Sequence, residues 1–342
     1  MINRRRITAP PWIYSMAFAA AVLILIVVAT GRGGTATFLS ALTLVPYLVL
    51  VGTGQMLVMT SGPGNIDVSV ASVISLAGYV SIAVSSSTGS AWLGILAAIG
   101  VGLATAFVSV IAITVASIPP IVATLASGLI VSSFTLTMAN GFSGTAAPGL
   151  RAFVNASLFR VPWLAILTAL FTVGIALMLI YTVYGRRLLA VGQAYGAADY
   201  ARIRPARIMA STYFISGALA GLTGALLAAF IAPTPDLGGA YLLDSIAVVV
   251  IGGTLISGGR AVPLGVWGGA MFFILLDALL NLVGWSLAGQ NILKGLLVLA
   301  VLFLAGGRPK LNRKQRATGA VPADADPEDA EKPTVTTPGA TA

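Results

Sequence analysis

Residues Pro162–Tyr184 read PWLAILTALFTVGIALMLIYTVY, a run of 23 residues without a charged side chain. About 20 consecutive apolar residues make a helix long enough to cross the hydrocarbon core of a bilayer. The next residues are Gly185, Arg186 and Arg187, and arginines concentrate at the cytoplasmic ends of such helices. This run therefore predicts a helix that crosses a membrane and ends in the cytoplasm.

Similar apolar runs recur between residues 12 and 306, and 58% of the 342 residues are hydrophobic while 8% are charged. A soluble domain carries about a quarter charged residues, so a soluble globular protein is excluded. We predict an all-α polytopic membrane protein with about ten transmembrane helices. The predicted spans are Trp12–Thr30, Leu39–Thr60, Ile66–Val84, Trp92–Ala116, Pro120–Ala139, Pro162–Tyr184, Ile208–Ala232, Leu243–Ser257, Val262–Gly284 and Asn291–Ala305. The eighth is short and flanked by glycine, which leaves open whether it crosses the bilayer fully.

The distribution of basic residues favours ten spans with both termini in the cytoplasm. With this topology the cytoplasmic side receives Arg4–Arg6, the arginines of Gly185–Arg207, Arg260 and Arg308–Arg316. The outer side receives only Arg32, Arg151, Arg160 and Lys294. This asymmetry is typical of membrane proteins, whose cytoplasmic loops carry an excess of Lys and Arg. Nucleic acid is not an expected partner, because the formal charge of +9 follows the membrane topology.

We expect three parts in the chain: a cytoplasmic N-terminus (1–11), a transmembrane domain (12–306) and a cytoplasmic tail (307–342). The first span has no cleavage site of the A-x-A type and is expected to be retained as an anchor. The tail is basic at first, acidic from Asp324 to Glu331, and otherwise rich in Pro, Thr, Ala and Gly. Such a composition is typical of a disordered extension.

Residue types that most catalytic sites need are missing. The chain has no Cys and no His, which excludes thiolate nucleophiles, Cys/His zinc sites and His-based triads. It has no G-x-x-x-x-G-K-[ST] sequence, the loop with which many ATPases bind phosphate. We therefore predict no enzyme activity, no cofactor and no metal. Intramembrane carboxylates are scarce for an ion-coupled carrier, so we expect a carrier that another subunit powers.

The acidic residues between residues 12 and 306 are Asp67, Asp199, Asp236, Asp244 and Asp277. A charged residue at the centre of a bilayer costs about 2.5–3.5 kcal/mol on insertion scales. Asp67 and Asp244 stand at the starts of apolar runs, where they either cap a helix or line a polar path. Asp277 lies deeper in its span and is expected to face the bundle interior, with Asn281 one turn further along the same face.

The second and third spans are joined by TSGPGNIDVS at residues Thr60–Ser69. Its Gly-Pro-Gly sequence interrupts the helix and frees backbone groups that must find partners. Asn65, Asp67 and Ser69 follow the interruption, and Gln55 precedes it. One reading is a substrate site or gate, because transporters build such sites from broken helices. The other is a short cytoplasmic hairpin with an Asx-type cap.

Residues Gly185–Arg207, GRRLLAVGQAYGAADYARIRPAR, are the most polar segment of the membrane region. Its apolar residues fit one face of a short helix with a break at Gly196 and a stop at Pro205. A short amphipathic helix on the cytoplasmic face would suit the docking of a soluble partner. The alternative is a plain positively charged loop that rests on lipid.

Two pairs of glycines recur at a spacing of four residues, Gly217 with Gly221 and Gly265 with Gly269. Small residues at this spacing let two helices approach closely. Since the chain is rich in glycine, we expect contacts within the bundle rather than a dimer face.

Three stretches also carry a family resemblance: GQMLVMTS and IDVSVASV within Gly54–Val73, YGRRLLAVG within Tyr184–Ala198, and GAYLLDSIAVVVIGGT and SGGR within Gly239–Arg260. Together they resemble the permease subunits of bacterial ABC importers for simple sugars, of the ribose, xylose, arabinose and autoinducer-2 type. The resemblance covers most of residues 45–306. The chain departs from the family pattern at Gly62–Asn65, Ala71, Asp199, Arg202 and Leu242–Leu243.

The resemblance implies a multi-pass protein of the bacterial inner membrane. Its partners would be ATP-binding subunits, a periplasmic or lipid-anchored solute-binding protein, a second permease subunit, and membrane lipid. The residues expected at the translocation path or gate are Gln55, Asn65, Asp67, Ser69, Asp244, Asp277 and Asn281. The residues expected in the loop that contacts the ATPase are Gly185, Arg186, Gly192, Ala197 and Ala198.

Other functions stay open at this point. A permease for nucleosides or branched-chain amino acids would look alike in sequence. A self-contained secondary transporter or channel belongs to a different class, and it would move solute without any ATPase. An intramembrane enzyme is disfavoured by the missing catalytic motifs.

Overall fold

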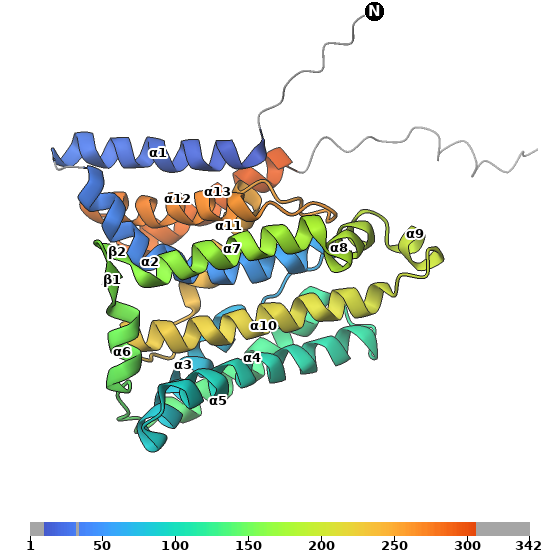
Figure 1. Cartoon of the computed structure of the whole chain (residues 1–342), viewed down its shortest axis with the longest axis horizontal. Helices are drawn as coiled ribbons and strands as arrows, with labels where there is room; N and C mark the ends of the chain where they lie inside the picture. The colour runs from blue at the N-terminus through green and yellow to red at the C-terminus, as the bar shows by residue number, and fades with distance from the viewer. Residues whose placement is uncertain (1–9, 32–33, 306–342) are drawn as a thin grey trace, which may run out of the picture. The chain divides into compact units, whose positions relative to one another are not determined.

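The computed structural model describes residues 10–31 and 34–305 (Figure 1). Its helices are α1 (Pro11–Thr30), α2 (Gly34–Thr60), α3 (Val70–Thr88), α4 (Ala91–Thr114), α5 (Pro120–Ala139), α6 (Pro148–Asn155), α7 (Trp163–Tyr181), α8 (Val183–Gln193), α9 (Tyr195–Tyr200), α10 (Pro205–Phe230), α11 (Gly239–Ile251), α12 (Pro263–Leu282) and α13 (Leu287–Ala305). Two short antiparallel strands, β1 (Ser157–Leu158) and β2 (Val161–Pro162), form a hairpin. The predicted tail and most of the predicted N-terminal segment lie outside the described residues.

Within these residues, eight helices are long and apolar enough to cross a membrane: α1, α2, α3, α4, α5, α7, α10 and α12. Two shorter apolar helices, α11 and the Leu287–Ala300 part of α13, take the places of the predicted eighth and tenth spans. The prediction of an all-α polytopic fold is confirmed. With 13 residues, α11 is about 20 Å long, against a hydrocarbon core of about 30 Å.

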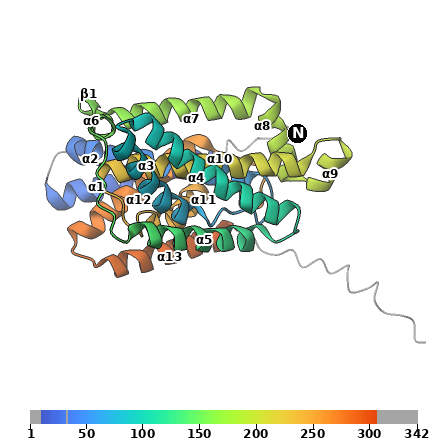
Figure 2. The same cartoon turned by 90° about the horizontal axis from the view of Figure 1, so that it is seen from below.

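The helices α2 and α10 form the centre of the bundle. Helix α10 packs against α4, α3 and α2, while α2 also packs against α12 and α11. Figure 2 shows α7 on one side of this centre, with α5 and α13 on the opposite side. The outer helices expose large apolar side chains, among them Phe134 of α5 and Leu170 of α7. These faces are suited to contact with lipid, because their backbone groups are already satisfied within the helices.

Proline sets where several of these helices begin. Pro11, Pro120, Pro148, Pro205 and Pro263 each occupy a first position of a helix. Proline suits this position because its missing N–H would have no helical partner there. The prediction that Pro205 only stops a preceding helix is therefore incomplete, since this residue begins α10.

The run that predicted a single helix over Pro162–Tyr184 is divided in the structure. Helix α7 ends at Tyr181, and α8 begins at Val183. The Thr182 side chain accepts a hydrogen bond from the backbone N–H of Gly185 and so caps the new helix. A hydroxyl at this position accepts a hydrogen bond from one of the free N–H groups of the first turn. The helix can therefore be interrupted between α7 and α8 while this N–H group stays paired.

Glycines allow α10 to approach its neighbours closely. A Cβ atom at Gly217 would overlap the carbonyl oxygen of Gly102 in α4, and one at Gly221 would overlap the carbonyl oxygen of Ala98, one turn earlier in α4. In the same way, Gly265 of α12 lies against the backbone of Gly252, which follows α11. The predicted close contacts of small residues are thus confirmed, and they lie within this chain.

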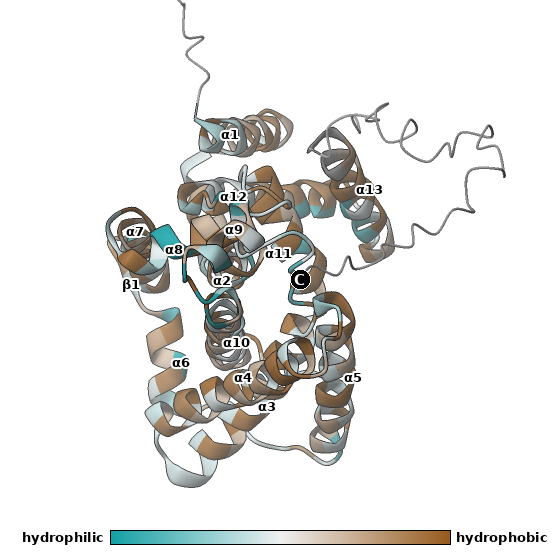
Figure 3. Ribbon diagram, turned by 90° about the vertical axis from the view of Figure 1, so that its right-hand side faces the viewer, coloured by the Kyte–Doolittle hydropathy of each residue, from teal (hydrophilic) through white to brown (hydrophobic). Residues whose placement is uncertain are grey.

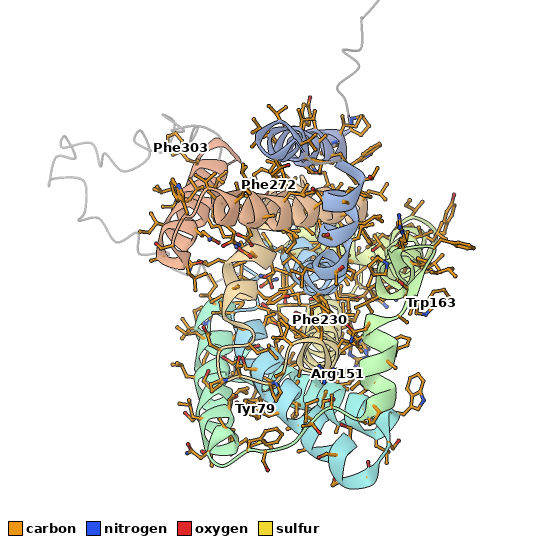
Figure 4. The ribbon with its side chains drawn as sticks, turned by 90° about the vertical axis from the view of Figure 1, so that its left-hand side faces the viewer. Tyr79, Arg151, Trp163, Phe230, Phe272 and Phe303 are labelled. Carbon is orange, nitrogen blue, oxygen red and sulfur yellow. The ribbon has the colours of Figure 1, made fainter. Side chains whose placement is uncertain are left out.

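Two stretches without helix enter the bundle from opposite ends. Residues 61–69 follow α2 near the end that carries α8 and α9 (Figure 1). Residues 231–238 follow α10 at the other end, which Figure 4 views with Phe230 among the helices and Trp163 at their edge. From there the chain returns to the first turns of α3, where the Gly238 N–H donates to Ser75 Oγ at 3.0 Å. Helices α3 and α11 therefore begin side by side inside the bundle.

Candidate functional site

Asp67 lies in the stretch 61–69, and its side chain is buried. One carboxylate oxygen accepts hydrogen bonds from the backbone N–H and the hydroxyl of Ser69, at 3.1 and 2.6 Å. The other accepts from the hydroxyl of Ser216 in α10 at 2.8 Å. Hydrogen bonds to a charged acceptor are among the stronger ones in proteins. Asp67 therefore fastens the start of α3 to α10.

The stretch 61–69 is itself largely buried, and only Pro63 and Gly64 of its residues are exposed. Asn65 is buried and donates its amide N–H to Ser61 Oγ at 2.9 Å. The backbone N–H of Val68 donates to Thr124 Oγ1 of α5 at 3.1 Å. Of the two readings of this segment, the structure favours a break inside the bundle, because its polar groups are satisfied by protein rather than by solvent.

Two further polar groups lie deep in the bundle without a hydrogen-bond partner among the described residues. They are the amide of Gln55 in α2 and the hydroxyl of Tyr213 in α10, one turn before Ser216. Both residues are at most 1% exposed. Buried polar atoms are nearly always paired. Gln55 and Tyr213 are therefore exceptions to this pairing among the described residues.

A cluster of three charged residues lies where α11, α12 and α13 meet. Lys294 Nζ of α13 is 2.9 Å from Asp244 Oδ2 of α11 and 2.9 Å from the carboxylate of Asp277 in α12. The side chains of Lys294 and Asp244 are 7% and 8% exposed, and that of Asp277 is 27% exposed. The ring of Phe273 lies 6.0 Å from the same nitrogen. One cation thus holds two carboxylates, which leaves a formal charge of −1.

These positions correct two expectations. Lys294 was expected on the outer side of the membrane, but it is buried within the bundle. Asp244 is not a helix cap, because it lies in the second turn of α11 and pairs with Lys294. Asn281 is exposed and accepts a hydrogen bond from the amide of Gln290 at 2.8 Å. It therefore adds a second polar link between the end of α12 and α13.

The segment Gly185–Arg207 contains α8 and α9, which are joined at Ala194 rather than at Gly196. The inner face of α8 carries the buried residues Leu188, Val191 and Gly192. A Cβ atom at Gly192 would overlap the carbonyl oxygen of Thr60, the last residue of α2, and the backbone nitrogen of Gly259. Helix α8 thus touches both the start of the break at residues 61–69 and the loop that follows α11.

Hydrogen bonds hold this three-way contact together. The Gly259 N–H donates to the carbonyl oxygen of Thr60 at 2.9 Å, and the amide of Gln193 donates to the carbonyl oxygen of Gly259 at 3.3 Å. At the other end of α8, a Cβ atom at Gly185 would overlap the backbone of Leu179 in α7. Helix α8 is therefore in close contact with backbone at both of its ends.

The outer face of the same segment is exposed. Arg186, Ala197 and Tyr200 are exposed, whereas Ala198 is buried against the bundle. Figure 3 shows the hydrophilic colour of α8 at this end. The arginines Arg187, Arg202, Arg204 and Arg207 line one depression of the surface. Among the described residues none of them forms an ion pair.

The structure brings the predicted path residues together in two groups rather than one. Asn65, Asp67 and Ser69 share the break next to α10, while Asp244, Asp277 and Asn281 gather around α13. Within the described residues there is no cluster of three or more Asp, Glu, His or Cys side chains suited to a metal ion.

Sequence reasoning missed three residues of these groups. Lys294 carried a usable signal, because a lone lysine inside an apolar run needs a buried partner. Ser216 and Tyr213 carried none, since hydroxyl side chains are common in helices of this kind. Only the packing of α10 against the break reveals their role.

A polytopic helical bundle with polar breaks and a polar segment at one end defines a membrane transport protein. Residues 37–305 match the family described as the permease component of the branched-chain amino acid transport system. The chain belongs to this family of transport permeases. This finding is consistent with the expectation that the chain is a transport component rather than an enzyme.

The chain is also similar to curated proteins of known name. It is 28% identical over 322 residues to the ribose import permease protein of Escherichia coli strain K12, covering 89% of this chain and 97% of that protein. It is 30% identical over 273 residues to an autoinducer 2 import system permease protein of Yersinia enterocolitica, covering 79% and 75%. It is 33% identical over 196 residues to the ribose import permease protein of Bacillus subtilis, covering 56% and 61%.

These relatives confirm the resemblance found in the motifs. They belong to import systems whose permeases were expected to match this sequence. No solved structure matches the chain.

Proposed function

We propose that this chain is the permease subunit of an ATP-binding-cassette importer and forms the path of a simple sugar across the bacterial inner membrane. ATP-binding subunits supply the energy, and a second permease subunit completes the path. An extracytoplasmic solute-binding protein delivers the sugar. Both termini lie in the cytoplasm.

One observation carries the proposal: the segment α8–α9 has an exposed outer face and an inner face that touches the start of the break at residues 61–69 and the loop that follows α11. Gly192 lies against Thr60 and Gly259, and these residues flank the stretch 61–69 and follow α11. A partner that pushes on Ala197 from outside would therefore displace the break that precedes α3 and the loop that follows α11. An importer needs a segment of this kind to transmit conformational change when ATP is hydrolysed by a separate subunit.

The path residues fit a polar, uncharged solute. Gln55, Asn65 and Asp67 supply amide and carboxylate groups near the break at residues 61–69, and Asp244, Asp277 and Asn281 supply them where α11, α12 and α13 meet. A sugar offers hydroxyl groups, which both donate and accept hydrogen bonds. These residues are proposed to line the path or its gate when two permease subunits face each other.

The names of the relatives support a sugar, since two of them are ribose import permeases and a third belongs to an autoinducer 2 import system. The family description names branched-chain amino acids instead, and this is the second candidate. A binding screen of the solute-binding protein encoded beside this gene separates them. Binding of ribose or another simple sugar supports the proposal, whereas binding of leucine, isoleucine or valine alone overturns the sugar assignment.

The motor is tested by reconstitution in liposomes with the co-encoded ATP-binding subunits and the solute-binding protein. We expect uptake that requires ATP and all the proteins. Accumulation against a gradient by the permease alone would instead identify a secondary transporter.

The path is tested by Asp67→Asn combined with Asp244→Asn, and unchanged uptake would leave these residues only structural roles.

The coupling role is tested by bulky side chains on the outer face of α9. Replacing both Ala197 and Ala198 with Trp should abolish uptake while the protein still reaches the membrane. The exposed Ala197→Trp alone separates docking from packing, because Ala198 is buried. A matched control is Leu170→Trp on the exposed face of α7, which should leave uptake unchanged. Normal uptake in the Ala197→Trp variant contradicts a docking role.

A further inference from the structure

Lys294 is the buried cation of the described bundle, and the proposed path does not use it directly. Its ammonium group contacts a carboxylate on α11 and another on α12, each at 2.9 Å. The described part of α13 packs chiefly against α11. Its opposite face is exposed and apolar, with Ile292, Leu296 and Leu299 on it. The attachment of α13 therefore combines the apolar packing of Leu293, Leu297 and Val298 against the core with the polar contacts of Lys294.

The partner of this lysine, α11, is unusual among the described helices. It is too short to cross a bilayer and begins inside the bundle beside the start of α3. Its far end leads into residues 252–262, where Gly259 is hydrogen-bonded to Thr60 and to Gln193 of α8. A displacement of α8 thus reaches α11 through backbone contacts and reaches α13 through Asp244.

We propose that Lys294 is a positioning residue that joins α11 to α13, so that both helices move as one element when α8 moves. This inference rests on the proposed coupling role of α8. A buried ion pair is well suited to such a joint because separating its partners inside the bundle leaves two uncompensated charges. Apolar packing alone would let α13 slide along α11, since apolar contacts have no fixed direction.

The first test measures movement between the two helices directly. The chain has no cysteine, so spin labels can be placed at Ala240→Cys in α11 and Leu299→Cys in α13, which are both exposed. In the otherwise unchanged permease we expect one narrow distance distribution, with or without nucleotide-bound ATP-binding subunits. Lys294→Met should broaden this distribution or make it change with nucleotide. The same narrow distribution in both proteins overturns the proposal.

The second test separates positioning from simple stability. Lys294→Met leaves Asp244 and Asp277 without their cation. The amount of this variant in the membrane should therefore fall whether Lys294 positions the two helices or only stabilises the fold. The variant with Lys294→Met, Asp244→Asn and Asp277→Asn has none of the three charges of this cluster. Its level in the membrane should therefore return to that of the unchanged protein. Because Asp244 and Asp277 are also proposed path residues, the reference is the variant with Asp244→Asn and Asp277→Asn that keeps Lys294. We expect the ATP-driven uptake of the triple variant to stay about 5- to 150-fold below that reference, the usual range of coupling between two sites. Full recovery of uptake overturns the proposal.

Two controls keep the outcomes distinct. Lys294→Arg retains the cation and should retain uptake, and Leu296→Met changes only the exposed face of α13 and should behave like the unchanged protein. If the unchanged complex shows no ATP-dependent uptake, the proposed function fails, but the spin-label distances in the permease alone still test the joint. If uptake is normal and the distances do not depend on Lys294, the joint alone fails.

Discussion

The bundle buries carboxylates in two regions and compensates them by different means. Asp67 receives three hydrogen bonds from Ser69 and Ser216, and among the described residues no Lys or Arg forms an ion pair with it. Asp244 and Asp277 share the ammonium group of Lys294. The first region joins α3 to α10 through neutral donors, and the second joins α11, α12 and α13 through charge.

This difference has a consequence for how each region responds to change. A carboxylate held by several hydrogen bonds can lose its donors one at a time, so the stabilisation of its charge decreases in steps. An ion cluster depends on its single cation, so removal of that cation exposes all its charges together. The first region is therefore suited to graded rearrangement, and the second to keeping helices in a fixed relation.

The largest effect is expected for Lys294→Met. Breaking a buried ion pair by removing one partner costs about 3–5 kcal/mol. The apparent free energy of unfolding, measured by denaturant titration in mixed micelles, should fall by this amount, while Lys294→Arg loses much less. A fall below about 1 kcal/mol, the value typical of exposed pairs, contradicts a buried cluster.

In the hydrogen-bonded region the expected effect is smaller. Ser216→Ala removes one of the three donors to Asp67, and a hydrogen bond to a charged group contributes about 1.5–3 kcal/mol. The same titration measures this loss. Ser133→Ala is the matched control, because its hydroxyl is exposed and bonds only within α5, so its effect should stay within about 0.5 kcal/mol. Equal losses in the two variants would contradict the role of Ser216.

A gain in stability is expected for Gln55→Leu. Its buried amide has no partner within the described residues, and an unsatisfied buried polar group costs about 1–3 kcal/mol. The substitution should raise the free energy of unfolding by about 1 kcal/mol and at the same time lower ATP-driven uptake. Loss of stability would show that the amide is satisfied in the membrane, and a gain without loss of uptake would remove Gln55 from the path.

The smallest effect is expected for Asp277→Asn. It leaves Lys294 and Asp244 as a balanced pair, and the Asp277 side chain is the most exposed of the three. We expect a change of less than about 1 kcal/mol in the free energy of unfolding, well below the loss caused by Asp244→Asn. The reverse order would mean that Asp277 is the main partner of the lysine.

Much of the fold was predictable from local sequence, because spans, proline starts and glycine contacts depend on residues close together in the chain. The run at Pro162–Tyr184 predicted its helix and erred only at Thr182, where a capping hydroxyl divides it. The site was less predictable. Asp67 and Asp244 were recognised as unusual, but hydropathy and spacing do not tell which donor from a distant helix will reach them.

Composition and periodicity by themselves determined a polytopic helical membrane protein, since apolar length and charge asymmetry suffice for that. The family motifs then pointed to a permease. Only the tertiary structure decided that α11 begins inside the bundle, that α8 touches the break after α2 and the loop after α11, and that Lys294 lies between two carboxylates. Each of these depends on contacts between residues far apart in the chain, and the free energy of such contacts is set by burial and geometry rather than by local sequence.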